Sequence, residues 1–240
     1  MIGRGEILFC TSWDDGDKYD MKMAKLLDKF GFKGTFFITT ENIREEQIRA
    51  ADVRCLSTYH EIGSHTLTHP DLTKITEEVA VNEIFRSKSI LENLIDKEVQ
   101  SFCYPYGKYN PSIVDIVRKA GYRYARTTGR LNVTSLENMY LISPTFAIVP
   151  RFLSITTAKA FLSAPLRSLL SVSKLEYDIL SRANQGGLFF HLWGHSWDVE
   201  RRNYWDRLAD FFSFASDNYK LKCVTFCELA ANVLKFAQVR

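Results

Sequence analysis

Hydrophobic residues recur along the chain in two alternating patterns, which predict strands and helices in turn. Short runs of apolar, β-branched or aromatic residues predict strands, or the ends of strands, at residues 7–12, 35–39, 62–64, 102–104, 122–125, 188–193 and 222–226. Between these runs, apolar residues at helical spacing predict helices over residues 19–30, 76–96, 111–120 and 205–219. Such alternation is typical of a parallel α/β sheet. We find no internal repeat and no linker, so we expect residues 1–240 to form one domain.

Residues with catalytic potential follow four of the predicted strands directly. They are Asp14 and Asp15, His65 and His69, the segment 104–107, and the pair His191 and His195. In α/β barrels, catalytic side chains gather where the strands end at their carboxyl side. We therefore expect these residues to meet on one rim of the fold.

The two histidines at 65 and 69 have the spacing of a metal site. On a helical turn, residues four apart point to the same side, so His65 and His69 can share one ion. Zn²⁺ favours neutral imidazoles and a carboxylate, and a catalytic site leaves a position open for water or substrate. Asp14 and Asp15 supply more carboxylates than one ligand set needs, which leaves a candidate base. The pattern predicts metal-assisted hydrolysis.

Each motif alone has a simpler interpretation. His-x-x-x-His occurs by chance on surface helices, and Asp-Asp-Gly is typical of a turn. However, the chain has only five histidines, and four of them lie in two close pairs. This clustering favours the metal site over scattered, solvent-exposed histidines.

The composition fits a globular protein of enzyme size, with 46% hydrophobic residues in a chain of 240. The formal net charge is +3 and no long basic run is present, so we expect no nucleic-acid partner. No stretch approaches the roughly 20 apolar residues that a membrane span needs. The N-terminus lacks the pattern of a signal peptide, so we expect a cytoplasmic protein, although a truncated start would leave its location open.

The five cysteines are an odd number, and several lie in apolar runs. This favours reduced, buried thiols over a disulfide framework. The spacing of Cys223 and Cys227 would suit a metal pair. We favour a buried junction between a strand and a helix there, because the sequence has no matching pair elsewhere.

Three motifs resemble those of the polysaccharide deacetylases of the NodB-homology type, carbohydrate esterase family 4. The segment 12–16, Ser-Trp-Asp-Asp-Gly, is similar to the family's Thr-Phe-Asp-Asp-Gly. The segment 65–69, His-Thr-Leu-Thr-His, is similar to its His-Ser/Thr-x-x-His, and 104–107, Tyr-Pro-Tyr-Gly, to its third motif. The resemblance is dense over residues 7–126, resumes over 187–198 and is thin between them.

This resemblance implies a fold, a cofactor and a base. The implied fold is a single distorted (β/α)7 barrel, which the alternation of strands and helices alone could not fix. The implied cofactor is one divalent metal ion, Zn²⁺ with Co²⁺ or Ni²⁺ as alternatives, held by Asp15, His65 and His69. Asp14 is then the catalytic base. The oligomeric state stays open.

The resemblance also implies a general acid and substrate contacts. The family's last motif places a histidine at the end of a hydrophobic strand, and here His191 and His195 compete; an extended strand would point both to one side. We favour His195, which lies at the apparent end of the strand, and His191 is then a substrate contact or a buried, hydrogen-bonded histidine. Pro105 and Tyr106, on the third-motif turn, and Trp193 are expected to contact the substrate.

The chain departs from the family's pattern at several places. Trp13 replaces the usual Phe, and Tyr104 stands where many members carry an arginine that braces the base; Arg126 is a candidate replacement. We find no counterpart of the fourth motif, whose tryptophan lines the acetyl pocket. The region 131–174 offers Tyr140, Pro144, Phe146, Pro150, Phe152 and Phe161 instead. These changes leave the reaction type standing and the substrate open.

The sequence therefore predicts a hydrolase that removes the N-acetyl group from an N-acetylated sugar or glycan. One alternative is a deacylase or amidohydrolase of a small, non-polymeric N-acyl or formamide compound. Another is a non-catalytic, carbohydrate-binding relative. The retained ligand, base and acid residues favour an enzyme, because a binding module needs neither a base nor an acid.

Overall fold

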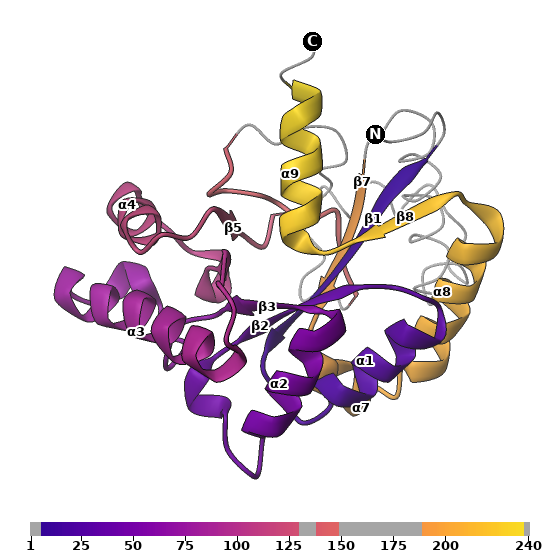
Figure 1. The fold of residues 1–240 in the computed structure, drawn as a ribbon, viewed down its shortest axis with the longest axis horizontal. Coiled ribbons are helices and arrows are strands. Elements are labelled where there is room, and N and C mark those ends of the chain that lie inside the picture. The colour runs from indigo at the N-terminus through magenta and orange to yellow at the C-terminus, as the bar shows by residue number, and fades with distance from the viewer. Residues whose placement is uncertain (1–5, 130–137, 149–188, 238–240) are drawn as a thin grey trace, which may run out of the picture.

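A curved parallel sheet runs through the centre of the molecule, with helices packed around it (Figure 1). The computed structural model describes residues 6–129, 138–148 and 189–237. In this part of the chain the sheet has eight strands, and seven of them follow the order β5-β4-β3-β2-β1-β7-β6. The strands are β1 (Ile7–Asp15), β2 (Gly34–Ile38), β3 (Glu61–Ser64), β4 (Ser101–Cys103), β5 (Tyr124–Arg126), β6 (Phe146–Ala147), β7 (Phe189–Gly194) and β8 (Leu221–Val224).

Strand β1 lies at the centre of this sheet and pairs with three other strands. One of its edges pairs with β7 from Leu8 to Trp13, and the other pairs first with β8 and then with β2. Between the two outermost strands, β5 and β6, residues 139–142 form backbone hydrogen bonds with β5. The chain then continues into β6, which pairs with β7. The sheet therefore curls almost into a closed barrel. This confirms the predicted parallel α/β barrel.

Most helices lie on the outside of the sheet and connect its strands, whereas the last helix follows the last strand and packs against a cluster of buried residues that includes Leu8 and Cys10. The helices are α1 (Asp20–Lys29), α2 (Ala50–Tyr59), α3 (Glu77–Ile95), α4 (Pro111–Lys119), α7 (Ser196–Arg201), α8 (Trp205–Asn218) and α9 (Phe226–Ala237), with 3-10 turns η1 (Thr40–Asn42), η2 (Leu72–Lys74) and η3 (Pro105–Gly107). The four predicted helices are confirmed as α1, α3, α4 and α8. The predicted strand over 222–226 is wrong at its end, because β8 stops at Val224 and Phe226 begins α9 without an intervening turn.

Side chains of β1 alternate between two cores. Phe9 and Trp13 pack outward in the cluster beneath the helices, while Leu8 and Cys10 pack inward in a second cluster inside the barrel. Because successive side chains of a strand point to opposite faces, the next inward position after residue 12 is Asp14. The strand pattern thus delivers this carboxylate to the barrel interior just below the rim.

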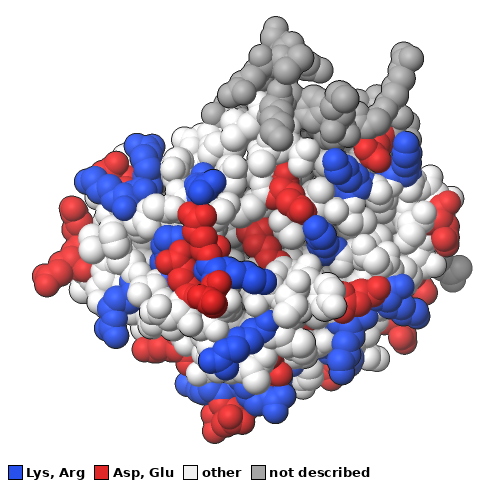
Figure 2. All heavy atoms as spheres, in the orientation of Figure 1, with Lys and Arg blue, Asp and Glu red and all other residues white. Residues whose placement is uncertain are grey.

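The thiols are reduced as predicted, but their burial varies from buried Cys10 and Cys103 to exposed Cys55. All five cysteines are free, and Cys227 lies at the start of α9, which confirms the strand-to-helix junction. None of the helices in the described ranges is both long and apolar enough to cross a bilayer. On the face drawn in Figure 2, acidic and basic side chains are interleaved rather than gathered into one basic area.

Candidate active site

The carboxyl ends of β1, β3 and β7 bring a carboxylate and three imidazoles together. Oδ1 of Asp15 lies 3.7 Å from Nε2 of His65 and 3.6 Å from Nε2 of His69. One ligand atom from each of these residues lies within 4.8 Å of the others. Nε2 of His195 approaches the other carboxylate oxygen of Asp15, at 3.8 Å. The predicted meeting of these residues on one rim is confirmed.

The loop that carries His65 and His69 is not the helical turn that their spacing suggested. Thr66 and His69 have φ angles of 68° and 61°, so the chain turns through the left-handed region twice. The hydroxyl of Thr66 accepts a hydrogen bond from the backbone N–H of His69 at 3.0 Å. The helical turn assumed for this spacing is not formed, because local side-chain bonds replace the helical ones, yet both imidazoles still reach the same carboxylate.

A buried acid, Glu83 of α3, holds this loop in place. Its carboxylate accepts hydrogen bonds from the backbone N–H groups of Leu67 and Thr68, at 2.9 and 3.0 Å, and from the Thr68 hydroxyl at 2.8 Å. Glu83 was not among the site residues predicted from the sequence. The available signal was an acid on the apolar face of α3, where a charged side chain is rarely buried without a partner.

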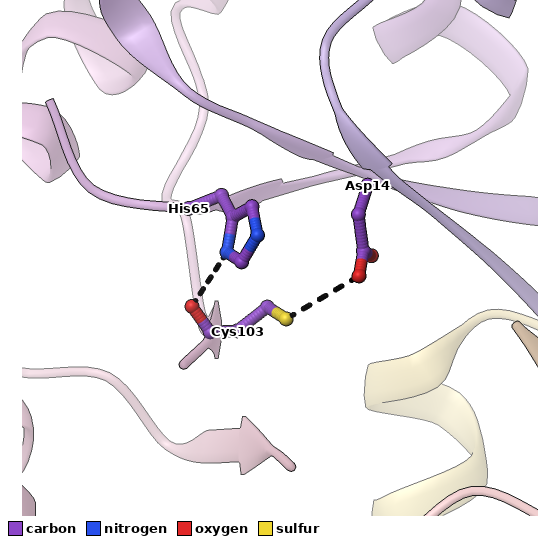
Figure 3. Close-up of side chains that lie close together, drawn as sticks. All are labelled: Asp14, His65 and Cys103. Atoms are coloured by element: carbon purple, nitrogen blue, oxygen red, sulfur yellow. Dashed lines mark hydrogen bonds between the residues drawn. The ribbon is translucent and has the colours of Figure 1, made fainter. Parts of the chain in front are cut away.

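The hydrogen bonding of His65 fixes which nitrogen is free. Its Nδ1 lies 2.7 Å from the main-chain oxygen of Cys103 (Figure 3). A carbonyl oxygen only accepts, so Nδ1 carries the proton and Nε2 presents its lone pair to Asp15. Burial lowers the pKa of both His65 and His69, which keeps these imidazoles neutral at pH 7. Lone pairs of two imidazoles and a carboxylate then converge without a proton between them, and this donor set fits a divalent cation such as Zn²⁺.

Asp15 itself is held by its backbone. It has a φ of 84°, and the following Gly16 a φ of 75°, so a tight turn ends β1. The main-chain oxygen of Asp15 accepts hydrogen bonds from Thr39 N–H at 3.2 Å and from the Asn42 side-chain amide at 2.9 Å. A non-glycine residue in this region of φ costs energy, which these contacts offset.

Asp14 points into the barrel and pairs with Arg126 of β5. The guanidinium donates to both carboxylate oxygens, and both side chains are buried. The same group lies 2.9 Å from the Cys103 sulfur, which in turn lies beside Asp14 (Figure 3). Burial, the largest single influence, would raise the pKa of Asp14. Arg126 together with His65 and His195 more than offsets this effect, so the pKa lies below its usual value. Arg126 therefore has the contact that was predicted for a replacement of the missing arginine at position 104.

The two competing histidines lie at different depths. His195 stands at the N-terminus of α7 on the rim, partly exposed beside Asp15. His191 is fully buried, its Nε2 lies 2.9 Å from the Ser12 hydroxyl, and burial lowers its pKa well below the usual value. The structure thus places His195 with the other rim residues and His191 below them. The nearby Asp198 receives hydrogen bonds from Arg201 and Arg202.

The predicted substrate contacts differ in exposure. Tyr106 is 55% exposed, and its ring lies 4.7 Å from the His69 ring. Pro105 is buried at the start of η3. Trp193 is also buried, with the Arg126 guanidinium 4.9 Å from its ring centre. Among the aromatic and proline residues that were expected to replace the fourth motif, Pro150, Phe152 and Phe161 lie outside the described residues.

A polar cavity of about 400 Å³ opens beside the metal-ligand set. It is lined by Asp15, Asp17, Thr39, Glu41, Asn42, Gln47, Thr68, His69 and Trp197. Carboxylates, amides and hydroxyls dominate these walls, and no lysine or arginine is among them. The cavity can accommodate a hydrophilic molecule next to the converging lone pairs.

Comparison with known proteins finds relatives of the same kind. A family model described as polysaccharide deacetylase matches residues 5–125. A peptidoglycan-N-acetylglucosamine deacetylase of Bacillus cereus is 33% identical over 100 residues, 40% of this chain and 35% of the relative. A poly-beta-1,6-N-acetyl-D-glucosamine N-deacetylase of Staphylococcus aureus is 26% identical over 148 residues, 55% of this chain and 51% of the relative. The chain thus spans about a third to a half of the length of these relatives.

Solved structures of other proteins superpose on a larger share of this chain than the sequence relatives match. The Xyl-CE4 domain of a multidomain xylanase from the hindgut metagenome of Trinervitermes trinervoides superposes with a TM-score of 0.65 and 17% identity, covering 95% of this chain and 91% of that one. The peptidoglycan deacetylase PdaC from Bacillus subtilis superposes with a TM-score of 0.62 and 16% identity, covering 99% and 96%. At this identity the likeness concerns the fold.

Proposed function

Because the chain belongs to the polysaccharide deacetylase family, we propose that it is a metal-dependent hydrolase that removes the acetyl group from an N-acetylated sugar or glycan. The observation that carries this proposal is the convergence of three lone-pair donors beside a buried, arginine-paired carboxylate. Membership of the family indicates the reaction type, and the residues on the rim are of the kinds that such a reaction needs.

Asp15, His65 and His69 are the proposed ligands of one divalent ion. Zn²⁺ suits two imidazoles and one carboxylate, and Co²⁺ or Ni²⁺ are the alternatives. When bound, such an ion lowers the pKa of water to about 7 and polarises a carbonyl oxygen. The neutral state of both imidazoles supports this assignment, since a protonated imidazole has no lone pair to offer.

Asp14 is the proposed base. Arg126 keeps its carboxylate ionised at neutral pH, so it can accept the proton of the attacking water. The same pairing makes Asp14 a weaker base, which is the cost of holding it charged inside the barrel. The ion pair also fixes the carboxylate in one orientation toward the rim.

His195 is the proposed general acid, because it stands on the rim partly open to solvent, with its Nε2 3.8 Å from Asp15 Oδ2. Its proton goes to the nitrogen of the departing amine when the amide bond breaks. Tyr106, the exposed aromatic residue next to His69, is the proposed substrate contact. The polar cavity beside Asp15 is consistent with a hydroxyl-rich substrate.

The proposal is tested by loading the metal-free protein with Zn²⁺, Co²⁺ or Ni²⁺ and measuring acetate release. The substrates are N-acetylglucosamine, its oligomers, and nucleotide-linked or lipid-linked forms. We expect acetate release that depends on the metal and on at least one of these glycans. Metal binding without turnover of any N-acyl sugar would favour the carbohydrate-binding alternative, and turnover of small formamides alone would favour the small-molecule deacylase.

A further inference from the structure

The two carboxylate oxygens of Asp15 face different partners. Oδ1 lies on the side of the His65 and His69 nitrogens. Oδ2 accepts a hydrogen bond from the indole Nε1–H of Trp197, at 2.9 Å. One oxygen is thus directed at the proposed metal position, and the other is occupied by a neutral donor from α7.

The indole of Trp197 is held from several directions. The preceding Ser196 is fully buried, and its hydroxyl donates to the buried carboxyl of Asp20 at 2.6 Å, which fastens the start of α7 to the start of α1. The Trp197 ring lies 5.0 Å from the His195 ring, and the Arg201 guanidinium lies 5.2 Å from its centre. The N–H of Trp197 is therefore presented to Asp15 by a rigid support.

We propose that Trp197 is a positioning residue that keeps Asp15 as a one-oxygen ligand and thereby sets the affinity and geometry of the metal site. This inference rests on the proposed function, because it takes Asp15, His65 and His69 as the ligands. A carboxylate with a free second oxygen can chelate through both atoms and fill a position that water or substrate needs. The indole N–H occupies that oxygen.

The identity of the residue at 197 matters physically. An arginine or lysine at this place would also satisfy Oδ2, but it would set a positive charge near the cation and weaken its binding. A tryptophan supplies a donor and no charge. Nε2 of His195 also lies 3.8 Å from Oδ2, so this oxygen stands next to the proposed acid as well.

The matched test compares Trp197→Phe with Trp205→Phe. Each change removes one indole N–H that donates to a carboxylate, since Trp205 Nε1 donates at 2.5 Å to Glu200, which is not a proposed metal ligand. We expect Trp197→Phe to weaken Zn²⁺ binding by about 10–100-fold, the usual effect of losing a partner of a metal ligand. The visible spectrum of the Co²⁺ form should change as well. Trp205→Phe should leave both readouts unchanged.

A second variant separates the lost hydrogen bond from lost packing. Benzothienylalanine at position 197 keeps the shape of the indole and replaces its N–H by sulfur, so it should reproduce the weakened metal binding. If either position-197 variant binds Zn²⁺ like the Trp205→Phe control, with the same Co²⁺ spectrum, the positioning role is wrong. Failure of the unaltered protein to bind metal would instead refute the proposed function, so the two failures are distinguishable.

Discussion

The two ends of the same sheet treat their polar groups in opposite ways. At the amino ends of the strands, Glu61 of β3 is surrounded by donors. Its carboxylate accepts hydrogen bonds from the hydroxyls of Thr35 and Ser101 and from the backbone N–H and thiol of Cys227. At the rim, Oδ1 of Asp15 faces the Nε2 atoms of His65 and His69. At the amino ends the acceptors are satisfied by hydrogen bonds, and at the rim these acceptors are left facing one another, an arrangement that suits a cation.

Two histidines that flank β3 show the contrast most directly. His60, just before the strand, accepts from Gly34 N–H at its Nδ1, and its Nε2 lies 3.4 Å from an Asp28 oxygen. His65, just after the strand, has a partner only for its Nδ1 proton, and its Nε2 faces Asp15. Residue type and burial are the same for both. The difference in what each second nitrogen meets separates a structural histidine from a candidate ligand.

The largest effect should come from the base. Asp14→Asn keeps the shape and one acceptor oxygen for Arg126 but cannot take a proton, so acetate release should fall by about 10²–10⁴-fold. Metal content should stay at the level of the unaltered protein, since Asp14 is not a proposed ligand. Steady-state assays with matched metal loading measure both. A loss below about tenfold would count against Asp14 as the base.

A second test compares His191, which is buried in β7, with His195, which lies on the rim at the start of α7. His195→Ala should lower activity by about 10²–10⁴-fold, since it removes the proposed acid. His191→Ala should act mainly on stability, because His191 contacts Ser12 inside the barrel. Turnover and thermal unfolding of both variants are compared. If His191→Ala is the more damaging to turnover and His195→Ala nearly silent, the two roles must be exchanged.

At the amino ends of the strands, Glu61→Gln should lower the stability of the fold and leave the turnover number nearly unchanged. The amide lacks the charge of the carboxylate, and its NH₂ either meets the Cys227 N–H or requires the Ser101 hydroxyl and the Cys227 thiol to become acceptors, so the variant should lose about 1–3 kcal/mol in the free energy of unfolding. Denaturant titration measures this loss, and kcat should stay within a few-fold. A large fall in turnover with unchanged stability would break the comparison, because it would make the Glu61 cluster functional.

A change with pH rather than with sequence concerns Asp20, the buried carboxyl that anchors α7. Burial raises the pKa of Asp20 from its ordinary 3.8 to about 8, although the Ser196 hydroxyl favours the charged form. The folded state therefore keeps a proton that the unfolded chain releases above pH 4. Stability should fall as pH rises from about 4 to about 8, by up to about 1.4 kcal/mol per pH unit, and then level off.

The control is Asp20→Asn, which has no titrating group at position 20 and should therefore lose this dependence of stability on pH. Unfolding of the metal-free protein in denaturant at pH 5, 6, 7 and 8 should give a steeper decline for the natural chain than for Asp20→Asn. Equal slopes for the two proteins would show that Asp20 is ionised in the folded state. The anchor between Ser196 and Asp20 would then be a charged one.

The strands and the rim residues could be predicted because they depend on local pattern. Apolar runs locate β1, β2 and β7, and the acidic and histidine motifs lie directly behind strands, where a parallel barrel brings them together. The helix α2 was not predicted, since Ala50–Tyr59 buries little apolar surface beyond Val53 and Leu56. Hydrophobic periodicity alone does not distinguish a short helix of this kind from a loop.

The supporting contacts could not be read from the sequence, because they join distant segments. Glu83 reaches back to the histidine loop and Trp197 reaches Asp15 across 182 positions. Arg126 could be suspected only because Tyr104 left the base without its usual partner, and the structure places it against Asp14. Left-handed residues such as Thr66 carry no marker in a non-glycine sequence.

The most direct test of the rim as a metal centre is elemental analysis of three variants purified in parallel with the natural chain. His65→Ala and His69→Ala each remove a proposed ligand, and His60→Ala removes the histidine on the other side of β3. We predict that the natural chain and His60→Ala hold about one divalent ion per molecule, as a site with three protein ligands does, while His65→Ala and His69→Ala lose most of it. Full occupancy in both rim variants, or equal loss in His60→Ala, would contradict the account.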